Sequence, residues 1–393
     1  MPWREGAAAA VFAVTFLLLA LGRLGRFPLP RGASALAGGL ATTILLGVGW
    51  GVVDLQVILL IVGLMGLAAL ADEAGALAGL RRRLATTPPR LALWLCLAAT
   101  AFASAILLND AAIVVLVPFL LPLLRRLGIP PVPAVVHLAV AANVGSLLTP
   151  FGNPQNAVLA SAAGLNVLDF LAAQAWPVAF GLALLGLAAW TTKVGTPSGE
   201  PVPPAAARGR PWLLACLALF LVLAAWRPAD VGLGSLAVAC AALAWLGLRP
   251  SLGRGADRAV ARSLDWNVIA FFVGLYLLTG GLQIWAPEPD LAATLVDPWR
   301  ATAAVAMLSN TIGNVPAVLT LLRLDPAWTT GHAMFLVSAS TLGGAMLLTG
   351  SAASLLAADQ ARRHGVEVRF LPFLRHAVPW TLPVLAFAAW LTW

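Results

Sequence analysis

The sequence is divided into long apolar runs, each close to the length that a helix needs to cross a membrane. About 20 consecutive apolar residues span the roughly 30 Å hydrocarbon core. Only 10% of the 393 residues are charged, against roughly 25% in an ordinary soluble protein, and the mean hydropathy is +0.91. We therefore expect an all-α polytopic membrane protein. Candidate spans lie at 7–21, 33–50, 53–71, 137–163, 168–191, 211–226, 231–248, 266–285, 331–358 and 378–393.

Two further apolar segments, 91–124 and 291–322, carry polar residues in their middles. A single helix would be too long and polar at its centre, whereas hairpin arms of about 15 residues are too short to cross. We predict that both are re-entrant hairpins. All but Arg4, Arg227, Arg300 and Arg323 of the 24 Lys and Arg residues then fall on one face. The positive-inside rule makes that face cytoplasmic, so both termini are expected outside the inner (cytoplasmic) membrane.

The two halves of the sequence resemble each other. VDLQVILLIVGL from Val53 aligns with LDWNVIAFFVGL from Leu264, and SAILLNDAAIVVL from Ser104 aligns with SNTIGNVPAVLTL from Ser309. Each half holds five spans, an odd number, so the second half enters the membrane in the opposite sense. We predict two inverted five-helix repeats, at 1–192 and 212–393, joined by a cytoplasmic linker at 193–211. Each contains a hairpin, near 91–124 or 291–322, and a broken helix, near 137–163 or 331–358.

Inverted repeats with interrupted helices are typical of secondary transporters, whose sites lie where unwound backbone lines a cavity. Four interruptions qualify: Asn109 with Asp110, and the segments 149–156, 310–316 and 349–354. Alternatively, their polar residues only satisfy unwound backbone between packed helices. The predicted substrate-binding and ion-binding residues are Asn109, Asp110, Gly152, Asn153, Gln155, Asn156, Ser309, Asn310, Asn314, Thr349, Gly350 and Ser351.

Asp110 is the ionisable residue that the span assignment places at mid-membrane within a polar break. A charge there costs several kcal/mol unless it is paired or neutralised. Asp110 is a candidate to carry a proton, to ligate sodium, or to do both in turn; alternatively, it caps the following helix. The candidate sodium ligands are Asn109, Asp110 and Gly152, and no other metal or cofactor is expected. Asn143 and Thr341, about one turn before the breaks, are predicted to be hydrogen-bond partners between helices.

The NDAA run at Asn109, TPFGNPQN at Thr149 and SNTIGNVPAVL at Ser309 resemble the ion transporter superfamily of citrate-type permeases, divalent-anion symporters, arsenical pump permeases and sodium/proton antiporters. The arsenical-permease-like anion permeases are most similar. The chain departs from the pattern in two places: Asp110 ends a triplet that is Ser-Asn-Thr in the symporters, and Ser354 replaces an Asn in a second break that lacks its Pro. The resemblance implies a mobile transport domain and a homodimer.

These features predict a secondary active transporter of a small anion or oxyanion, coupled to sodium or protons. Close alternatives are arsenite or antimonite efflux and sodium/proton antiport. A membrane-embedded enzyme is disfavoured because such sites need several converging ionisable residues, and Asp110 stands alone at depth. A passive channel is the remaining alternative. No nucleic-acid partner is expected, since the basic residues are explained by membrane topology.

Overall fold

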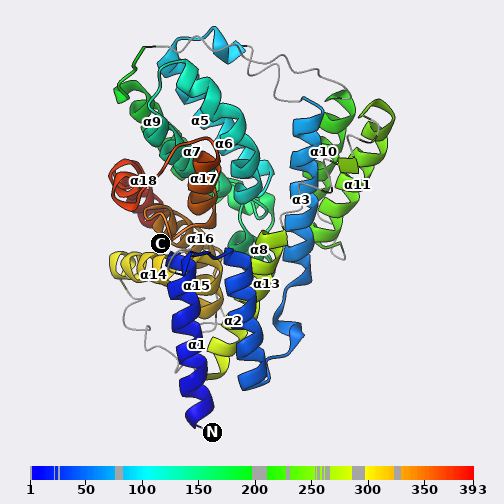
Figure 1. Cartoon of the computed structure of the whole chain (residues 1–393), viewed down its shortest axis with the longest axis vertical. Coiled ribbons are helices and arrows are strands. Elements are labelled where there is room, and N and C mark those ends of the chain that lie inside the picture. Colours follow the sequence, from blue (N-terminus) through cyan, green and yellow to red (C-terminus); the bar gives the residue numbers. More distant parts are fainter. Residues whose placement is uncertain are drawn as a thin grey trace.

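The computed structural model describes residues 2–21, 23–24, 27–75, 83–196, 210–226, 231–252, 254, 257–258, 261, 266–285, 297–322 and 329–393. In this part of the chain the structure is helical (Figure 1), apart from a two-residue antiparallel pairing of Arg23–Leu24 with Phe27–Pro28. The all-α prediction is therefore confirmed. Among the described residues, three helices are by themselves long and apolar enough to cross a membrane: Pro89–Ile106, Val167–Thr191 and Leu233–Leu252.

The helices follow the same order in both halves of the chain. The first half contains α1 (Pro2–Leu21), α2 (Arg31–Leu46), the short 3₁₀ helix η1 (Trp50–Val52), α3 (Leu55–Glu73), α5 (Pro89–Ile106), α6 (Asn109–Arg126), α7 (Pro131–Ser146), α8 (Pro154–Ala163) and α9 (Val167–Thr191). The second half contains α10 (Arg210–Trp226), α11 (Leu233–Leu252), α13 (Trp266–Trp285), α14 (Pro298–Ile312), α15 (Asn314–Leu321), α16 (Thr330–Ala345), α17 (Ala352–Arg363) and α18 (Phe370–Thr392).

Helices from opposite halves pack closely against each other. Helix α2 packs along α13, and α3 packs along α11 (Figure 1). A Cβ on Gly63 of α3 would lie 2.5 Å from the carbonyl carbon of Ala237, and one on Gly274 of α13 would overlap the backbone of Ala35. Gly63 and Gly274 are paired in the comparison of the two halves. The close approaches therefore occur at matched positions of the two halves, and the inverted repeat remains a prediction.

The hairpin arms differ from the prediction. Helices α5 and α6 each have 18 residues, or about 27 Å at 1.5 Å per residue, rather than about 15 residues. The arms are longer than predicted because α5 begins at Pro89, before the predicted segment, and α6 continues through Arg125 and Arg126. Helices α14 and α15, with 15 and 8 residues, stay within the predicted length. Re-entry of the hairpins remains a prediction.

The interruptions are also placed differently. The predicted break at 310–316 shrinks to Gly313, whose φ of 89° is accessible to glycine, because helix continues through Ile312. The two long helices are broken at 147–153 and 346–351. Both breaks begin a few residues before the predicted ones. The prediction placed their starts too late because the unwound turns contain leucines and a methionine, which favour helix. Of the predicted linker 193–211, residues 197–209 lie outside the described residues.

Candidate functional site

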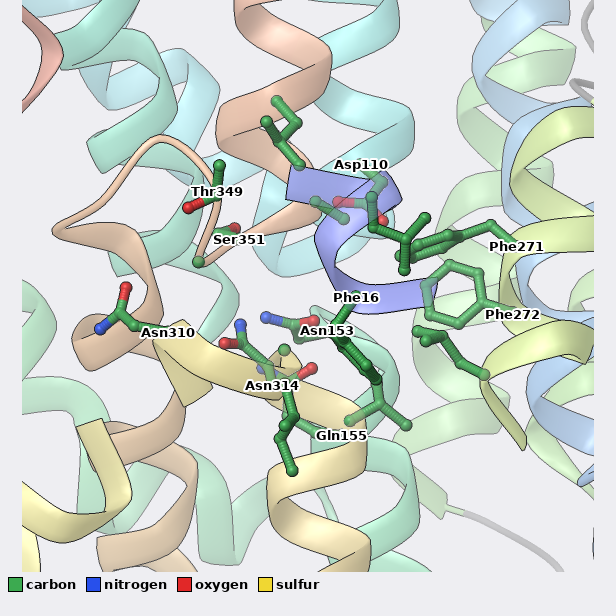
Figure 2. A pocket seen from close by; sticks show the side chains of 18 of the residues that line it. Phe16, Asp110, Asn153, Gln155, Phe271, Phe272, Asn310, Asn314, Thr349 and Ser351 are labelled. Carbon is green, nitrogen blue, oxygen red and sulfur yellow. The ribbon is translucent and has the colours of Figure 1, made fainter. Parts of the chain in front are cut away.

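A cavity of about 90 Å³ lies where the two hairpin tips meet the two helix breaks (Figure 2). Asp110, Phe271 and Phe272 lie on one side of it, and Asn310 lies on the opposite side. The cavity thus joins elements that are far apart in the sequence. Its polar and glycine lining comprises Asn109, Asp110, Asn153, Gln155, Asn310, Thr311, Gly313, Asn314, Thr349, Gly350 and Ser351.

In the first half, the hairpin tip is the turn between α5 and α6, which begins at Asn109. This tip packs against the break between α7 and α8. The backbone N–H of Asn109 donates to the carbonyl of Gly152 at 2.9 Å, and Thr149 Oγ1 donates to the carbonyl of Ala105 at 2.7 Å. A Cβ on Gly152 would lie 2.7 Å from the Cα of Ser146. Glycine at position 152 is therefore required for this close approach.

Asn156 holds the unwound backbone of the same break. Its Nδ2 donates to the carbonyls of Ser146 at 2.8 Å and of Thr149 at 3.0 Å. The carbonyl of Ser146 lies at the end of α7, where no further helical turn supplies N–H donors, and the carbonyl of Thr149 lies within the break. The amide nitrogen of Asn156 thus satisfies unwound backbone, as the alternative to ligand binding predicts. Its amide oxygen has no partner among the described residues.

In the second half, two asparagines play the corresponding part. Asn310 Nδ2 donates to the carbonyls of Ala306 at 2.8 Å and of Gly343 at 2.7 Å. With its amide nitrogen facing the nearby carbonyls, Asn314 donates to Ser340 and to Gly350, each at 3.1 Å. The contact of Asn314 with the carbonyl of Gly350 matches that of Asn109 with Gly152.

Hydrogen bonds to two side chains, Asn143 and Thr341, connect the halves. Asn143 Oδ1 accepts from Asn109 Nδ2 at 3.4 Å and from Ser351 Oγ at 3.1 Å. Thr341 Oγ1 accepts from Gln155 Nε2 at 2.9 Å. The prediction that Asn143 and Thr341 are hydrogen-bond partners between helices is confirmed.

Several buried oxygens around the cavity have no hydrogen-bond partner among the described residues. A buried acceptor without a partner costs about 1–3 kcal/mol, so such groups call for a partner from outside the chain, such as an ion, a ligand or water. Oxygens of this kind are what a hard cation takes as ligands. In the first half they are Ser104 Oγ, Asn109 Oδ1, Gln155 Oε1 and Asn156 Oδ1, and in the second half they are Ser309 Oγ, Asn310 Oδ1 and Ser354 Oγ.

Asp110 is the acidic group of the cavity. Its residue is 4% exposed, it is the second residue of α6, and no described residue forms an ion pair with it. The alternative in which it caps α6 is not supported, because no hydrogen bond joins its carboxylate to the first turn in this described part of the chain. None of the described lining residues is Lys, Arg or His.

Comparison with known proteins places the chain in a family. Residues 16–327 match the family model described as "Citrate transporter". This chain belongs to the citrate transporter family. The predicted resemblance to the ion transporter superfamily is thereby confirmed, and the protein is a multi-pass membrane transporter of the citrate-type anion class rather than an enzyme.

Individual relatives agree with this assignment. The chain is 31% identical to the inner membrane protein YbiR of Escherichia coli over 348 residues, which cover 86% of each chain. It is 25% identical to the silicon efflux transporter LSI3 of rice over 371 residues, covering 73% and 75%. In fold it is similar to the Alcanivorax borkumensis YdaH transporter, whose crystal structure revealed an unusual topology, with a TM-score of 0.52, 20% identity, and coverage of 98% and 95%.

The structure brings most of the predicted site residues of this citrate-family chain to one cavity. Gly152, Asn156 and Ser309 do not line it but are buried, in the break, in the first turn of α8 and in α14. Sequence reasoning missed one wall of the cavity. This wall is apolar and includes Phe16 and Leu19 from α1, and Phe271, Phe272 and Leu275 from α13.

A signal for that wall was present in the comparison of the halves. Phe271 and Phe272 align with Leu60 and Ile61 of α3, which are completely buried. Two aliphatic residues of α3 are thus replaced by two aromatic residues in α13, and only the aromatic pair lines the cavity. Aromatic rings next to polar breaks are suited to excluding water from a ligand.

Proposed function

We propose that the chain is a secondary active transporter that moves a small anion or oxyanion across the cytoplasmic membrane together with sodium ions or protons. The observation that carries the proposal is that residues of both halves whose buried oxygens have no partner among the described residues line one cavity, namely Asn109, Gln155 and Asn310. Breaks of this kind, in helices that face a common cavity, are how secondary transporters build their sites.

Two cation sites follow from the positions of the oxygens. The first uses the oxygens of Ser104, Asn109 and Asn156, together with the second lone pair of the Gly152 carbonyl. Asp110, at the same tip, adds a negative charge and either ligates the cation or takes up a proton in its place. The second site uses the three free oxygens of the second half, and it has no carboxylate among the described residues.

The substrate binds between these sites, where helix N-termini approach the cavity. Asn153 and Ser351 precede the first turns of α8 and α17, and Asn314 begins α15. The N–H groups and positive dipole ends of such turns favour an anion. Since no described lining residue is cationic, the charge of an anion is balanced by the bound cations, which is the basis of the proposed coupling.

A neutral acid, such as arsenous or antimonous acid, is the second candidate substrate, and its export is the corresponding function. The lack of cationic side chains in the described lining favours it, and one relative is named a silicon efflux transporter. Sodium/proton antiport is the third possibility, because Asp110 can exchange one cation for the other. A homodimer, two inverted repeats and termini outside the membrane complete the proposal.

A thermal-stability screen of the purified protein tests these choices. A ligand that binds the folded state raises the melting temperature through RT ln(1 + [L]/Kd). Sulfate, citrate, C4-dicarboxylates and arsenite are compared in sodium chloride and in choline chloride of equal ionic strength. Stabilisation by an anion only with sodium supports symport, whereas stabilisation by arsenite alone supports efflux of a neutral acid.

The variant Asn109→Leu and the control Ser34→Ala sharpen the screen. Asn109 contributes a free oxygen beside the cavity, whereas Ser34 lies on α2 outside the cavity lining. The proposal predicts that Asn109→Leu loses the response to sodium and that Ser34→Ala keeps it. If neither sodium, lithium nor pH changes the melting temperature or drives uptake into proteoliposomes, the proposed coupling is wrong.

A further inference from the structure

The outer surface of the first half carries an open apolar groove between α5 and α9. The groove has a volume of about 410 Å³ and is lined by Leu91, Trp94, Gly186, Leu187 and Trp190. None of these residues lines the cavity of the candidate site. Leu187 and Trp190 are 52% and 62% exposed, so a large apolar area lies open along two helices.

Gly186 and Trp94 together shape this groove. Trp94 Nε1 donates to the carbonyl of Leu182 at 3.4 Å, which places the indole against α9. A Cβ on Gly186 would lie 3.1 Å from two atoms of that indole, Cδ1 and Nε1. The missing side chain at position 186 therefore leaves room beside the ring, and a larger residue there would fill the groove.

Two positive charges lie at one end of the groove. Trp94 contacts Leu182, whereas Leu91 lines the groove together with Trp190, so α5 and α9 run in opposite directions here. Residues just before Leu91 and just after Trp190 consequently lie at the same end. Those residues include Arg90 and Lys193, which are exposed and form no ion pair with any described residue.

We propose that this groove is a binding site for an anionic phospholipid. One acyl chain lies along the groove between Trp94 and Trp190, and the phosphate of the headgroup lies near Arg90 and Lys193. A long apolar chain joined to a negative headgroup matches an apolar groove with a cationic end. Tryptophan rings favour the depth at which chain and headgroup meet, and long basic side chains reach from a helix end to that depth.

Another copy of this chain is the competing occupant. A helix from a second copy would cover the apolar residues but would leave Arg90 and Lys193 without an anion. The lipid accounts for both parts of the groove. Removal of each charge is expected to weaken binding of the anionic lipid by about fivefold, and it should not change binding of a zwitterionic lipid.

Native mass spectrometry of the delipidated full-length protein tests this site. The protein is titrated with phosphatidylglycerol and, in parallel, with phosphatidylcholine of the same acyl chains. The variants are Arg90→Gln combined with Lys193→Gln, which removes the charges, and Gly186→Leu, which fills the groove. The controls are Arg249→Gln, an exposed arginine on α11 that pairs with Asp257, and Trp176→Ala, an exposed tryptophan of α9 outside the groove.

The proposal predicts tighter binding of phosphatidylglycerol than of phosphatidylcholine by the unaltered protein. The double variant should lose this preference, Gly186→Leu should lose binding of both lipids at this site, and the controls should behave like the unaltered protein. The double variant changes two exposed residues, so the test does not depend on the folding of Gly186→Leu. Equal binding of the two lipids, or a preference that survives in the double variant, would overturn the proposal. So would a Gly186→Leu variant that changes from dimer to monomer while its lipid preference stays unchanged.

Discussion

The two halves build the same kind of site from different residues. In the first half, the tip carries Asp110 at the position that Val315 occupies in the second. The first break contains Pro150 and is followed at once by Pro154, whereas the second contains no proline. Both tips nevertheless dock on the break through an asparagine that donates to a glycine carbonyl, by its backbone N–H in the first half and by its side chain in the second.

The difference indicates a division of labour between the halves. Pro154 in the first turn of α8 fixes the backbone before the helix, so the first break is the stiffer one, and the tip that docks on it carries the charge of Asp110. The second tip relies on Gly313 in the left-handed region, which is accessible to glycine at little cost. We infer that the first half sets the cation requirement, and the second half adapts to the substrate.

The largest expected effect comes from the glycines on which the tips dock. Gly152→Ala places a methyl group 2.7 Å from the Cα of Ser146 and breaks the contact with the tip. We expect a loss of about 1–3 kcal/mol in stability and complete loss of ligand-dependent stabilisation, measured by thermal unfolding in detergent. Gly49→Ala is the control, because nothing lies within 4 Å of its added Cβ. Equal melting temperatures for the two variants would contradict the docking role of Gly152.

The charge difference between the tips is tested next. Asp110→Asn keeps the shape of the side chain but removes its charge, so we expect sodium-dependent or pH-driven accumulation in proteoliposomes to fall at least about tenfold. Asp359→Asn is the matched control, because Asp359 pairs with Arg362 and Arg363 at a helix end, at 2.7 and 3.3 Å. Intact pH-driven accumulation by Asp110→Asn would rule out proton carriage by this residue.

The third comparison separates structural and ligating roles at matched positions. Asn156 holds two carbonyls through its nitrogen, so Asn156→Ala should lower stability without ligand by about 1–3 kcal/mol. Ser354, its counterpart in the second half, has an unpaired Oγ. Ser354→Ala should therefore leave stability without ligand nearly unchanged and reduce only the stabilisation by sodium. Thermal unfolding with and without sodium measures both, and a Ser354→Ala variant with an intact sodium response would remove this residue from the second cation site.

The sequence predicted the elements of the site better than their geometry. Polar and glycine residues within apolar runs mark breaks, because unwound backbone in a membrane needs other partners, and this located the tips around Asn109 and Asn314. The break limits were wrong at 346–348, since Met346 and two leucines favour helix wherever local propensity alone decides. The wall formed by Phe16, Phe271 and Phe272 depends on packing between distant helices, which one sequence does not encode locally.

The smallest expected effect on the melting temperature concerns Glu367, an acidic residue of the second half outside the cavity. Glu367, in the loop before α18, accepts hydrogen bonds from Arg369 at 3.1 Å, and this hydrogen bond, helped by the positive charge, lowers the pKa of the Glu367 carboxyl. A lowered pKa means that the pair contributes stability above the pKa of the unfolded chain and loses it as the pH falls through the folded value.

The pair is exposed and screened by solvent, so Glu367→Gln should change the melting temperature only slightly, and only where the carboxylate is ionised. The sodium response should stay the same, because charge in the first half, at Asp110, sets it. Unfolding curves between mildly acidic and neutral pH, with and without sodium, check both statements. A sodium response that disappears in Glu367→Gln would show that a surface charge of the second half controls cation binding, and the proposed division of labour would then be wrong.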